Sequence, residues 1–256
     1  MPPPAPRGAR ERARAEITAE LLASARAHLV TDGAAGLSLR AVARDLGVAS
    51  SAVYRYVESR DALLTLLIVE AYDAVGDAVE HAARAAEQRG EPPAQRWLAA
   101  ARAMRTWALA NPHAFELVYG TPVRGYRAPQ DTVAPATRLW GVVVAVLLAA
   151  HADGTLRPAG PVYDPRRLVE PAVTEFAGLG AFEDLPADLE LAVTRSPTLF
   201  SVLVGAITAE LFGHLHNVAA DRGRIFDVTV ATASAGIGLH VDLGWGADLG
   251  YDRSRP

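Results

Sequence analysis

Side chains that could contact a nucleic acid gather between residues 40 and 60 of this 256-residue chain. Helical spacing brings Ser50, Ser51, Tyr54 and Arg55 to the outward face of one short helix. Short hydroxyls, an aromatic hydroxyl and a guanidinium suit the hydrogen-bonding groups of base edges and phosphates. The pattern therefore indicates contact with DNA, provided that neighbouring elements hold this face toward solvent.

Three residues at fixed spacing predict how that helix is held. Ala43 is small enough for a second helix to cross it, and Gly47 allows the left-handed backbone of a tight turn. Val53 then points back into a small core. The residues that complete this core are Leu39, Val42, Leu46 and Val48, with Ile17, Leu21, Ala25 and Leu29 on a preceding helix. This is the arrangement of a helix-turn-helix, although the three residues alone also fit a helical corner in an unrelated all-α protein.

The flanking sequence separates these two interpretations. Residues 33–64 read GAAGLSLRAVARDLGVASSAVYRYVESRDALL. This closely resembles the DNA-binding domain of the TetR family of tetracycline-repressor-like regulators, over roughly Ala15–Leu67. The segment Glu210–His214 and the helix before it resemble the dimerisation helices of actinobacterial-type members. The resemblance implies an all-α fold, with a three-helix helix-turn-helix domain followed by a larger helical domain for ligand binding and dimerisation.

The resemblance also implies roles for individual residues in the major groove. Arg40 occupies a position where family members reach a base or a phosphate. Ser50, Ser51 and Ala52 open the recognition helix, where base contacts concentrate. Ala52 replaces a glycine or threonine that is common in the family, which removes a possible hydroxyl contact.

Further positions match family residues that touch the DNA backbone. Tyr54 matches a tyrosine of this kind, with partial burial in the domain core as the alternative. Tyr56 stands where a histidine often does, and its hydroxyl can donate to phosphate. Arg60 matches a phosphate-binding residue that is usually lysine, and arginine keeps the charge while changing the geometry. Arg44 is assigned to a solvated face.

Helical periodicity divides the chain into four parts. They are a disordered basic arm, a DNA-binding domain, a regulatory and dimerisation domain and a flexible tail, over residues 1–11, 12–58, 59–245 and 246–256. We expect a first helix over about Arg12–Thr31, short helices from Ser38 and Ser50, and a fourth helix over Ser59–Arg89 that joins the two domains. Further helices are expected over about 94–110, 112–119, 132–152, 165–179, 197–217 and 225–242.

Charge is distributed unevenly along the chain. The formal net charge is -4, but residues 1–60 hold nine arginines and six acids, so the first part carries +3 and the remainder -7. Four of these arginines (Arg7, Arg10, Arg12 and Arg14) lie in or beside the expected arm. Such an arm can enter a minor groove, with a flexible solubilising tail as the alternative.

Aromatic residues in the middle of the chain suggest where an effector would bind. Ligand pockets are mostly apolar with a few polar groups. In the family that this chain resembles, the pocket lies among such helices. The predicted lining residues are Met104, Trp107, Phe115, Tyr119, Trp140, Val144 and Phe176, with His113, Arg138 and Glu175 as polar candidates. Plain core packing is the alternative for each of them.

The last two long helices are candidates for a homodimer interface. A two-fold symmetric reader of DNA must hold its two recognition helices roughly 34–36 Å apart. Apolar residues recur every four positions on one helix, and small residues on the next permit close approach. The predicted contacts are Leu203, Ile207, Leu211, Phe212, Leu215, Val228, Ala231 and Ala235, with the internal core of a monomer as the alternative.

Other functional classes find little support in the sequence. The chain has no cysteine, no phosphate-binding loop and no nucleophile or zinc-protease motif, so no cofactor or metal is expected and an enzyme is disfavoured. A pure scaffold would not need the polar face of the third helix. The longest apolar run, Val142–Ala150, is too short to span a membrane, and Met1–Ala9 is not a secretory signal. The resemblance to the TetR family implies a cytoplasmic regulator that binds double-stranded operator DNA and is released by an unknown small apolar effector, with repression as the family's commoner mode and activation as the alternative.

Overall fold

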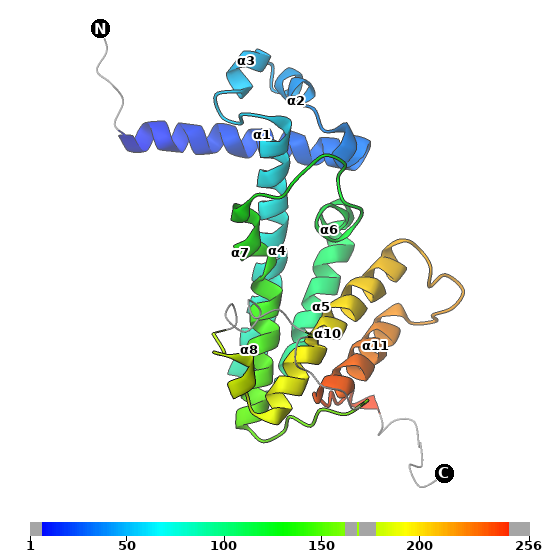
Figure 1. Cartoon of the computed structure of the whole chain (residues 1–256). Helices are drawn as coiled ribbons and strands as arrows, with labels where there is room; N and C mark the ends of the chain where they lie inside the picture. Colours follow the sequence, from blue (N-terminus) through cyan, green and yellow to red (C-terminus); the bar gives the residue numbers. More distant parts are fainter. Residues whose placement is uncertain (1–6, 162–167, 169–177, 246–256) are drawn as a thin grey trace. The chain divides into compact units, whose positions relative to one another are not determined.

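The computed structural model describes residues 7–161, 168 and 178–245 (Figure 1). It is 72% helical, and the described residues contain no strand, which confirms the expected all-α fold. The chain divides into two compact units. The first unit comprises residues 1–74 and 111–136, and the second comprises residues 75–110 and 137–256.

The first unit is built on a core shared by four helices. These are α1 (Arg7–Gly36), α2 (Leu39–Asp45), α3 (Ser50–Val53) and the first half of α4 (Arg60–Gln88). The predicted stripe on α1 packs against the inner faces of α2 and α3. Four residues of α4 join the same core, namely Leu63, Leu64, Leu67 and Ile68. The first unit therefore extends beyond residue 58, where the sequence placed a domain boundary.

The caps of these helices follow the predicted signals only in part. Ser59 caps α4, since its Oγ accepts a hydrogen bond from the Ala62 amide at 3.0 Å, and Asp61 lies in the first turn. Ser38 occupies the N-cap position of α2 but makes no side-chain capping bond. An acceptor side chain therefore secures the start of α4 but not that of α2.

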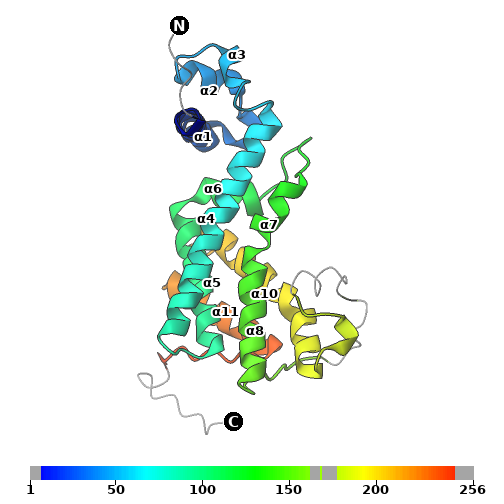
Figure 2. The ribbon, with the colours of Figure 1, turned by 90° about the vertical axis from the view of Figure 1, so that its left-hand side faces the viewer.

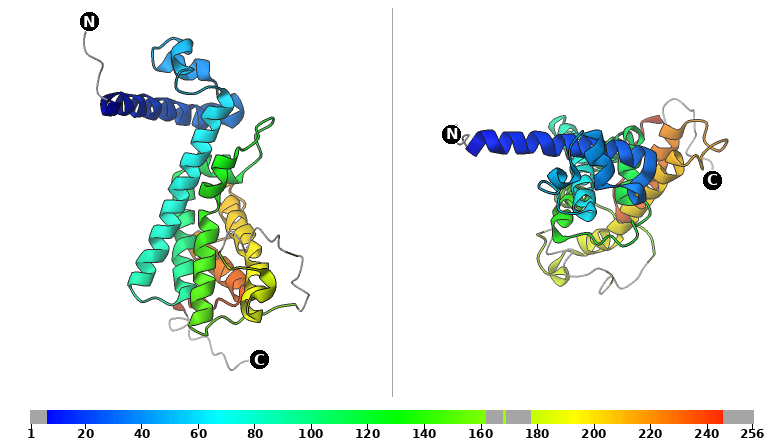
Figure 3. Two further views of the ribbon diagram at one scale, coloured as in Figure 1. Left: turned by 60° about the vertical axis from the view of Figure 1, so that its left-hand side comes forward. Right: turned by 90° about the horizontal axis from the view of Figure 1, so that it is seen from above.

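Helix α1 is longer than predicted at its start and is broken near its end. It begins at Arg7, so the backbone of Arg7 and Arg10 is helical where a disordered arm was expected. Its N-terminal half extends past α2 and α3 (Figure 3). At Gly33 the backbone takes φ 67° and ψ 174°, which interrupts the helix one turn before Gly36. The expected end of this helix near Thr31 is thus a kink followed by one more turn.

A second stretch of chain completes the first unit. It holds α6 (Pro112–Tyr119), a loop, a 3-10 turn η1 (Gln130–Thr132) and α7 (Val133–Ala136). Two tyrosines attach this stretch to α4. The Tyr72 hydroxyl donates to the Val118 carbonyl at 3.1 Å, and the hydroxyls of Tyr126 and Thr65 lie 2.9 Å apart. The helix expected over 132–152 is split, because Thr137 separates α7 from α8 (Arg138–Ala152).

The second unit packs the remaining helices around a separate core. Besides the end of α4 and α8 it holds α5 (Pro93–Ala110), the 3-10 turn η2 (Phe182–Asp184), α10 (Ala187–Leu211) and α11 (Arg222–Ile237). Helix α10 lies along α11, and α8 packs on α5 and α10 (Figures 1 and 2). The largest fully buried side chains of this core include Trp97, Leu98, Met104, Leu147 and Leu199.

Helix α10 differs from the prediction at both ends. It starts at Ala187, ten residues before the expected start, and contains Pro197. Proline cannot donate to the carbonyl four residues earlier, but the Ser196 hydroxyl donates to that Val193 carbonyl at 2.7 Å. The helix ends at Leu211 because Gly213, at φ 76°, allows the His214 amide to donate back to Ala209 at 2.9 Å.

Bidentate ion pairs tie α5 to its neighbours. The Arg102 guanidinium donates to both carboxylate oxygens of Asp227 on α11, at 2.9 and 2.7 Å. Arg105 donates to both oxygens of Glu210 on α10, each at 2.6 Å, and lies over the Phe226 ring. Paired in this way, the carboxylates of Asp227 and Glu210 can be buried without an unmet charge.

Two helical stretches, Gln130–Ala152 and Ala187–Leu211, are long and apolar enough to cross a membrane by length and composition. Core helices of globular proteins have the same character. The buried residues of α8 and α10 pack against α5 and against each other inside the second unit, so this packing accounts for their apolar composition.

A glycine in the middle of α4 makes room for an arginine clamp. Arg138 on α8 donates to Glu80 at 2.8 and 2.9 Å and to Asp77 at 2.5 Å. The hydrogen bond from Arg138 holds the pKa of the Glu80 carboxyl below its ordinary value. A Cβ atom at Gly76 would lie 2.7 Å from the Arg138 Cδ and Nε atoms. Gly76 therefore allows the guanidinium to lie against α4.

This clamp predicts a sign change in a double-mutant cycle. Gly76→Ala should lower the free energy of unfolding, because the displaced Arg138 loses its carboxylate bonds. In an Arg138→Ala background the same change should raise the free energy of unfolding by about 1 kcal/mol, the gain in helix propensity. Denaturant unfolding measures both. Gly141→Ala on α8, where a new Cβ meets nothing within 4 Å, is the control and should stabilise in both backgrounds. A stabilising Gly76→Ala in the otherwise unchanged protein would contradict the clamp.

Candidate nucleic-acid interface

The turn between α2 and α3 has the geometry that the sequence predicted. Gly47 takes φ 66°, and the Val48 amide donates to the Ala43 carbonyl at 3.0 Å. The Gly47 amide donates to Arg44 at 3.1 Å, which completes a Schellman ending for α2. Ala43 and Val53 are each 1% exposed, so the two helices cross at the predicted small residue.

Four predicted contact residues present exposed side chains on α2, on α3 and in the turn that follows α3. Arg40, Ser51 and Arg55 are exposed, and Tyr54 is 49% exposed, so core packing does not account for this tyrosine. None of the four side chains makes a hydrogen bond or an ion pair with any residue in the described ranges. Their donors are therefore available to phosphates and base edges.

The other predicted contact residues are partly covered. Ser50 is the first residue of α3, and both it and Ala52 are half-buried. Tyr56 packs its ring against the core of the first unit while remaining half-exposed. Their contact with DNA stays a prediction.

Arg60 has an internal role that the sequence did not suggest. Its Nη2 donates to the Ala34 and Ala35 carbonyls at 2.7 and 3.2 Å, and its Nε donates to Leu37 at 3.0 Å. These carbonyls belong to the last turn of α1 and the residue after it, which lack helical partners. The guanidinium therefore binds the end of α1 to the start of α4, and its phosphate contact remains a prediction.

A histidine bridges α1 and α2 within the helix-turn-helix domain. The His28 Nδ1 lies 3.0 Å from an Asp32 oxygen, and its Nε2 lies 2.7 Å from an Asp45 oxygen. The Ser24 hydroxyl donates to the same Asp45 oxygen at 2.9 Å. A neutral imidazole carries one N–H, so only the protonated ring can donate to both carboxylates.

These contacts shift the pKa values of both partners in the directions that favour the ion pairs. The hydrogen bond to Asp32 and, with a smaller effect, the hydrogen bond to Asp45 raise the pKa of His28 above its ordinary value of 6.5. Hydrogen bonds from Ser24 and His28 lower the pKa of Asp45, with a smaller effect from the charge of Arg44. Because the folded-state pKa of His28 is raised, its stabilisation is complete below pH 6.5 and is lost as the pH rises through the folded-state value.

The bridge predicts a pH-dependent stability of the first unit. The unfolding temperature should fall between pH 6 and 8.5, and His28→Gln should remove part of that fall because glutamine does not titrate. Thermal unfolding followed by circular dichroism measures this. His81→Gln, at an exposed position of α4, serves as the matched control. Equal pH dependence in the original protein and in His28→Gln would exclude a stabilising bridge.

None of the predicted apolar effector residues in the described ranges lines either of the two cavities considered below. Met104, Trp107, Trp140 and Val144 lie in the second unit, where the Trp140 ring stacks on Phe200 at 5.7 Å. Phe115 and Tyr119 lie in the first unit, where Tyr119 also packs edge-on against Tyr72. Burial raises the pKa of Tyr119. Phe176 and Glu175 lie outside the described residues.

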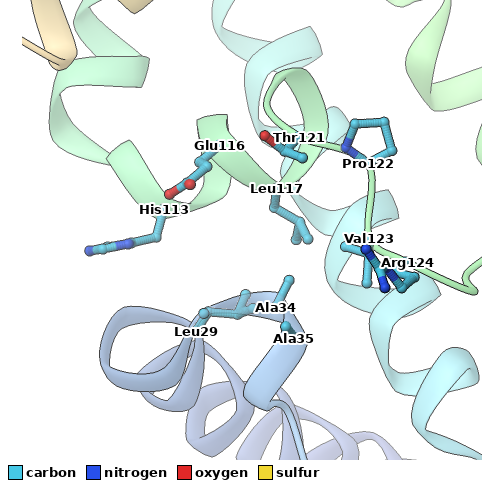
Figure 4. Close-up of a pocket in the computed structure, with 11 residues that line it drawn as sticks. Leu29, Ala34, Ala35, His113, Glu116, Leu117, Thr121, Pro122, Val123 and Arg124 are labelled. Atoms are coloured by element: carbon cyan, nitrogen blue, oxygen red, sulfur yellow. The ribbon is translucent and has the colours of Figure 1, made fainter.

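The described cavities lie elsewhere. One, in the first unit, has a volume of about 470 Å³ between the end of α1 and α6 (Figure 4). It includes His113, a predicted polar candidate. The other, about 350 Å³, lies on α10 and α11 in the second unit. Arg138, the third polar candidate, is engaged by Glu80 and Asp77.

The predicted dimer contacts need a correction. Leu203 and Ile207 are 1% and 0% exposed within the single chain, so they belong to its own core and cannot meet a partner. The four-residue repeat marks the inner face of α10. Phe212 and Leu215 follow the end of the helix, and Phe212 is 56% exposed. The remaining predicted contacts on these two helices are half-buried or, for Val228, 43% exposed: Leu211, Val228, Ala231 and Ala235.

Family models match both parts of the chain. The model for bacterial regulatory proteins of the tetR family matches residues 21–67, which contain α2, the turn and α3. The model for the tetracyclin repressor-like C-terminal domain matches residues 97–233. The first match covers the helix-turn-helix, and the second covers most of the second unit.

Curated relatives and solved structures agree with these matches. An HTH-type transcriptional regulator of Mycobacterium tuberculosis (strain H37Rv) is 40% identical over 239 residues, which cover 91% of this chain and 97% of the relative. The crystal structure of regulatory protein SCO4313 is 30% identical with a TM-score of 0.65, and the match covers 90% of this chain and all of that one. A Rhodococcus sp. RHA1 protein is 26% identical with a TM-score of 0.57, over 86% of this chain and 92% of its own.

Proposed function

The chain belongs to the TetR family of bacterial regulatory proteins, and we propose that within this family it acts as a repressor that leaves its operator when a small molecule binds. It is a DNA-binding transcriptional regulator. The proposed mode of DNA binding is supported by the exposed side-chain donors in and just after the helix-turn-helix, which have no hydrogen-bond or ion-pair partner among the described residues: Arg40, Ser51, Tyr54 and Arg55. We propose that it acts in the cytoplasm, where its operator DNA would lie.

The exposed arginines are proposed to contact phosphates. Arg40 lies on α2 and Arg55 lies in the turn just after α3, and neither is held by a carboxylate among the described residues. Each phosphate contact releases counterions, which makes DNA affinity depend on salt. Tyr54 and Ser51 lie between them in sequence and supply hydroxyls to base edges or the backbone.

This proposal predicts a change in salt dependence. Arg55→Ala and Arg40→Ala should each weaken binding to DNA from upstream of the protein's own gene. Each should also reduce the slope of log affinity against log salt concentration by about 0.9. Fluorescence anisotropy across a salt series measures both quantities. Arg44→Ala removes the same charge from an exposed position of α2 and should leave the slope unchanged. Unchanged slopes for Arg40→Ala and Arg55→Ala would disprove these contacts.

A homodimer is proposed through the outward face of α10 and α11. The residues that line the cavity on these helices include three small ones (Gly205, Ala206 and Ala209) and Ile225. Ile225 and Val228, one turn apart on α11, and Phe212 after α10 are large exposed apolar side chains, and exposed apolar patches on a monomer mark interaction sites. A partner copy would cover these residues in place of Leu203 and Ile207.

The dimer surface is tested by a charge placed on it. Ile225→Glu should convert a dimer into a monomer, because an unpaired carboxylate would be buried at the interface. Sedimentation velocity at micromolar concentration measures the change. Leu148→Glu, on an exposed apolar residue of α8, should leave the dimer intact. The interface would be wrong if Ile225→Glu remained dimeric.

A further inference from the structure

A cleft inside the first unit combines an apolar middle with charged ends. Its volume of about 470 Å³ lies within the roughly 300–1,000 Å³ of small-molecule sites. One wall is the kinked end of α1, with Leu29 and Ala34, and the other is α6, with Leu117. In Figure 4 the Leu117 side chain points toward the Ala34 wall, so apolar groups face each other across the cleft.

Both walls are held from outside the cleft. On the α1 side, Arg60 binds the Ala34 and Ala35 carbonyls, which fixes the turn after Gly33. On the α6 side, Tyr72 binds the Val118 carbonyl, and Tyr126 contacts Thr65 from the following loop. These bonds keep the two walls apart without using any side chain that faces the cavity. A ligand would therefore meet a preformed site, which lowers the cost of ordering on binding.

The charged groups at the two ends of the cleft have opposite signs. His113 and Glu116 lie at one end of the cleft, and Arg124 lies at the other (Figure 4). None of these three side chains makes a hydrogen bond or an ion pair within the part of the chain that the structure describes. A simple anion would be repelled by Glu116, and a simple cation would be repelled by Arg124.

We propose that this cleft binds a small aromatic hydroxy acid. The carboxylate pairs with Arg124, the ring lies between Leu117 and Ala34, and the hydroxyl donates to Glu116 with His113 beside it. The proposal rests on the proposed function, since it names the class of effector that the regulator senses. It places the effector in the DNA-binding unit rather than among the predicted aromatic residues.

The position of the cleft explains how binding would reach the DNA. Gly33, the kink of α1, forms part of the wall, and α1 carries the stripe against which α2 and α3 pack. A ligand that prefers one kink geometry shifts the helix-turn-helix toward the matching arrangement by its difference in affinity. The cavity on α10 and α11 is a weaker candidate, because its buried carboxylate, Glu210, is already bound by Arg105.

The probe for this site is 6-hydroxy-2-naphthoate, which carries its two polar groups at opposite ends of a flat ring. Isothermal titration calorimetry on the full-length protein should show binding. Removal of the charged partner in Arg124→Ala should weaken it about tenfold or more. Ala35→Phe, at an exposed lining position, should block it by filling the cleft. Arg127→Ala, exposed in the same loop but outside the lining, is the control and should bind normally.

Two further compounds test the chemistry of the two ends. The loss of the hydroxyl in 2-naphthoate, and the replacement of the carboxylate by a neutral hydroxyl in 2,6-dihydroxynaphthalene, should each weaken binding. The site is overturned if 6-hydroxy-2-naphthoate does not bind at millimolar concentration, or if Arg124→Ala and Ala35→Phe bind it unchanged.

A parallel operator-binding assay separates this proposal from the proposed function. Release of DNA by the probe, lost in Arg124→Ala, supports both. Binding at the cleft without release supports the site and counts against release by this ligand. Release by another compound that Ala35→Phe does not affect overturns the cleft as the effector site and leaves the regulator function standing.

Discussion

The first unit depends on how the broken end of α1 is held. Helix α1 ends at Gly36, so the carbonyls of its last turn lack helical partners, and the Arg60 guanidinium binds two of them, Ala34 and Ala35, together with that of Leu37 just after the helix. A planar group with several fixed donors can do this, whereas an ammonium cannot reach the same set. The start of α4, the end of α1 and one wall of the cleft are therefore fixed by a single side chain.

Two sets of arginines differ in whether a carboxylate of the protein holds them. In the second unit, Arg102, Arg105 and Arg138 are held by carboxylates and bind one helix to another. On the helix-turn-helix, Arg40 and Arg55 have no protein partner among the described residues. A guanidinium that is already paired must break those bonds to reach a phosphate, so the unpaired arginines are the ones suited to DNA.

The placement of surfaces within each unit suggests a division of labour. The first unit holds both the helix-turn-helix and the cleft. Helix α1 packs against α2 and α3 and also lines the cleft, so effector and DNA would both act through α1. The second unit carries the exposed apolar face of α10 and α11, which suits a partner copy. The His28 bridge adds a proton-dependent contact between α1 and α2 in the unit that reads DNA.

The sequence by itself determined the features that depend on neighbouring residues. The turn at Gly47, the cap at Ser59 and the exposed face of α3 each need only a few positions in a row, so their signals are local. Tertiary structure decided which side of α10 is buried, because Leu203 and Ile207 form an apolar stripe that fits a core or an interface equally well. It also decided that His28 meets Asp45 and that Arg60 binds α1, since those contacts join residues far apart in the chain.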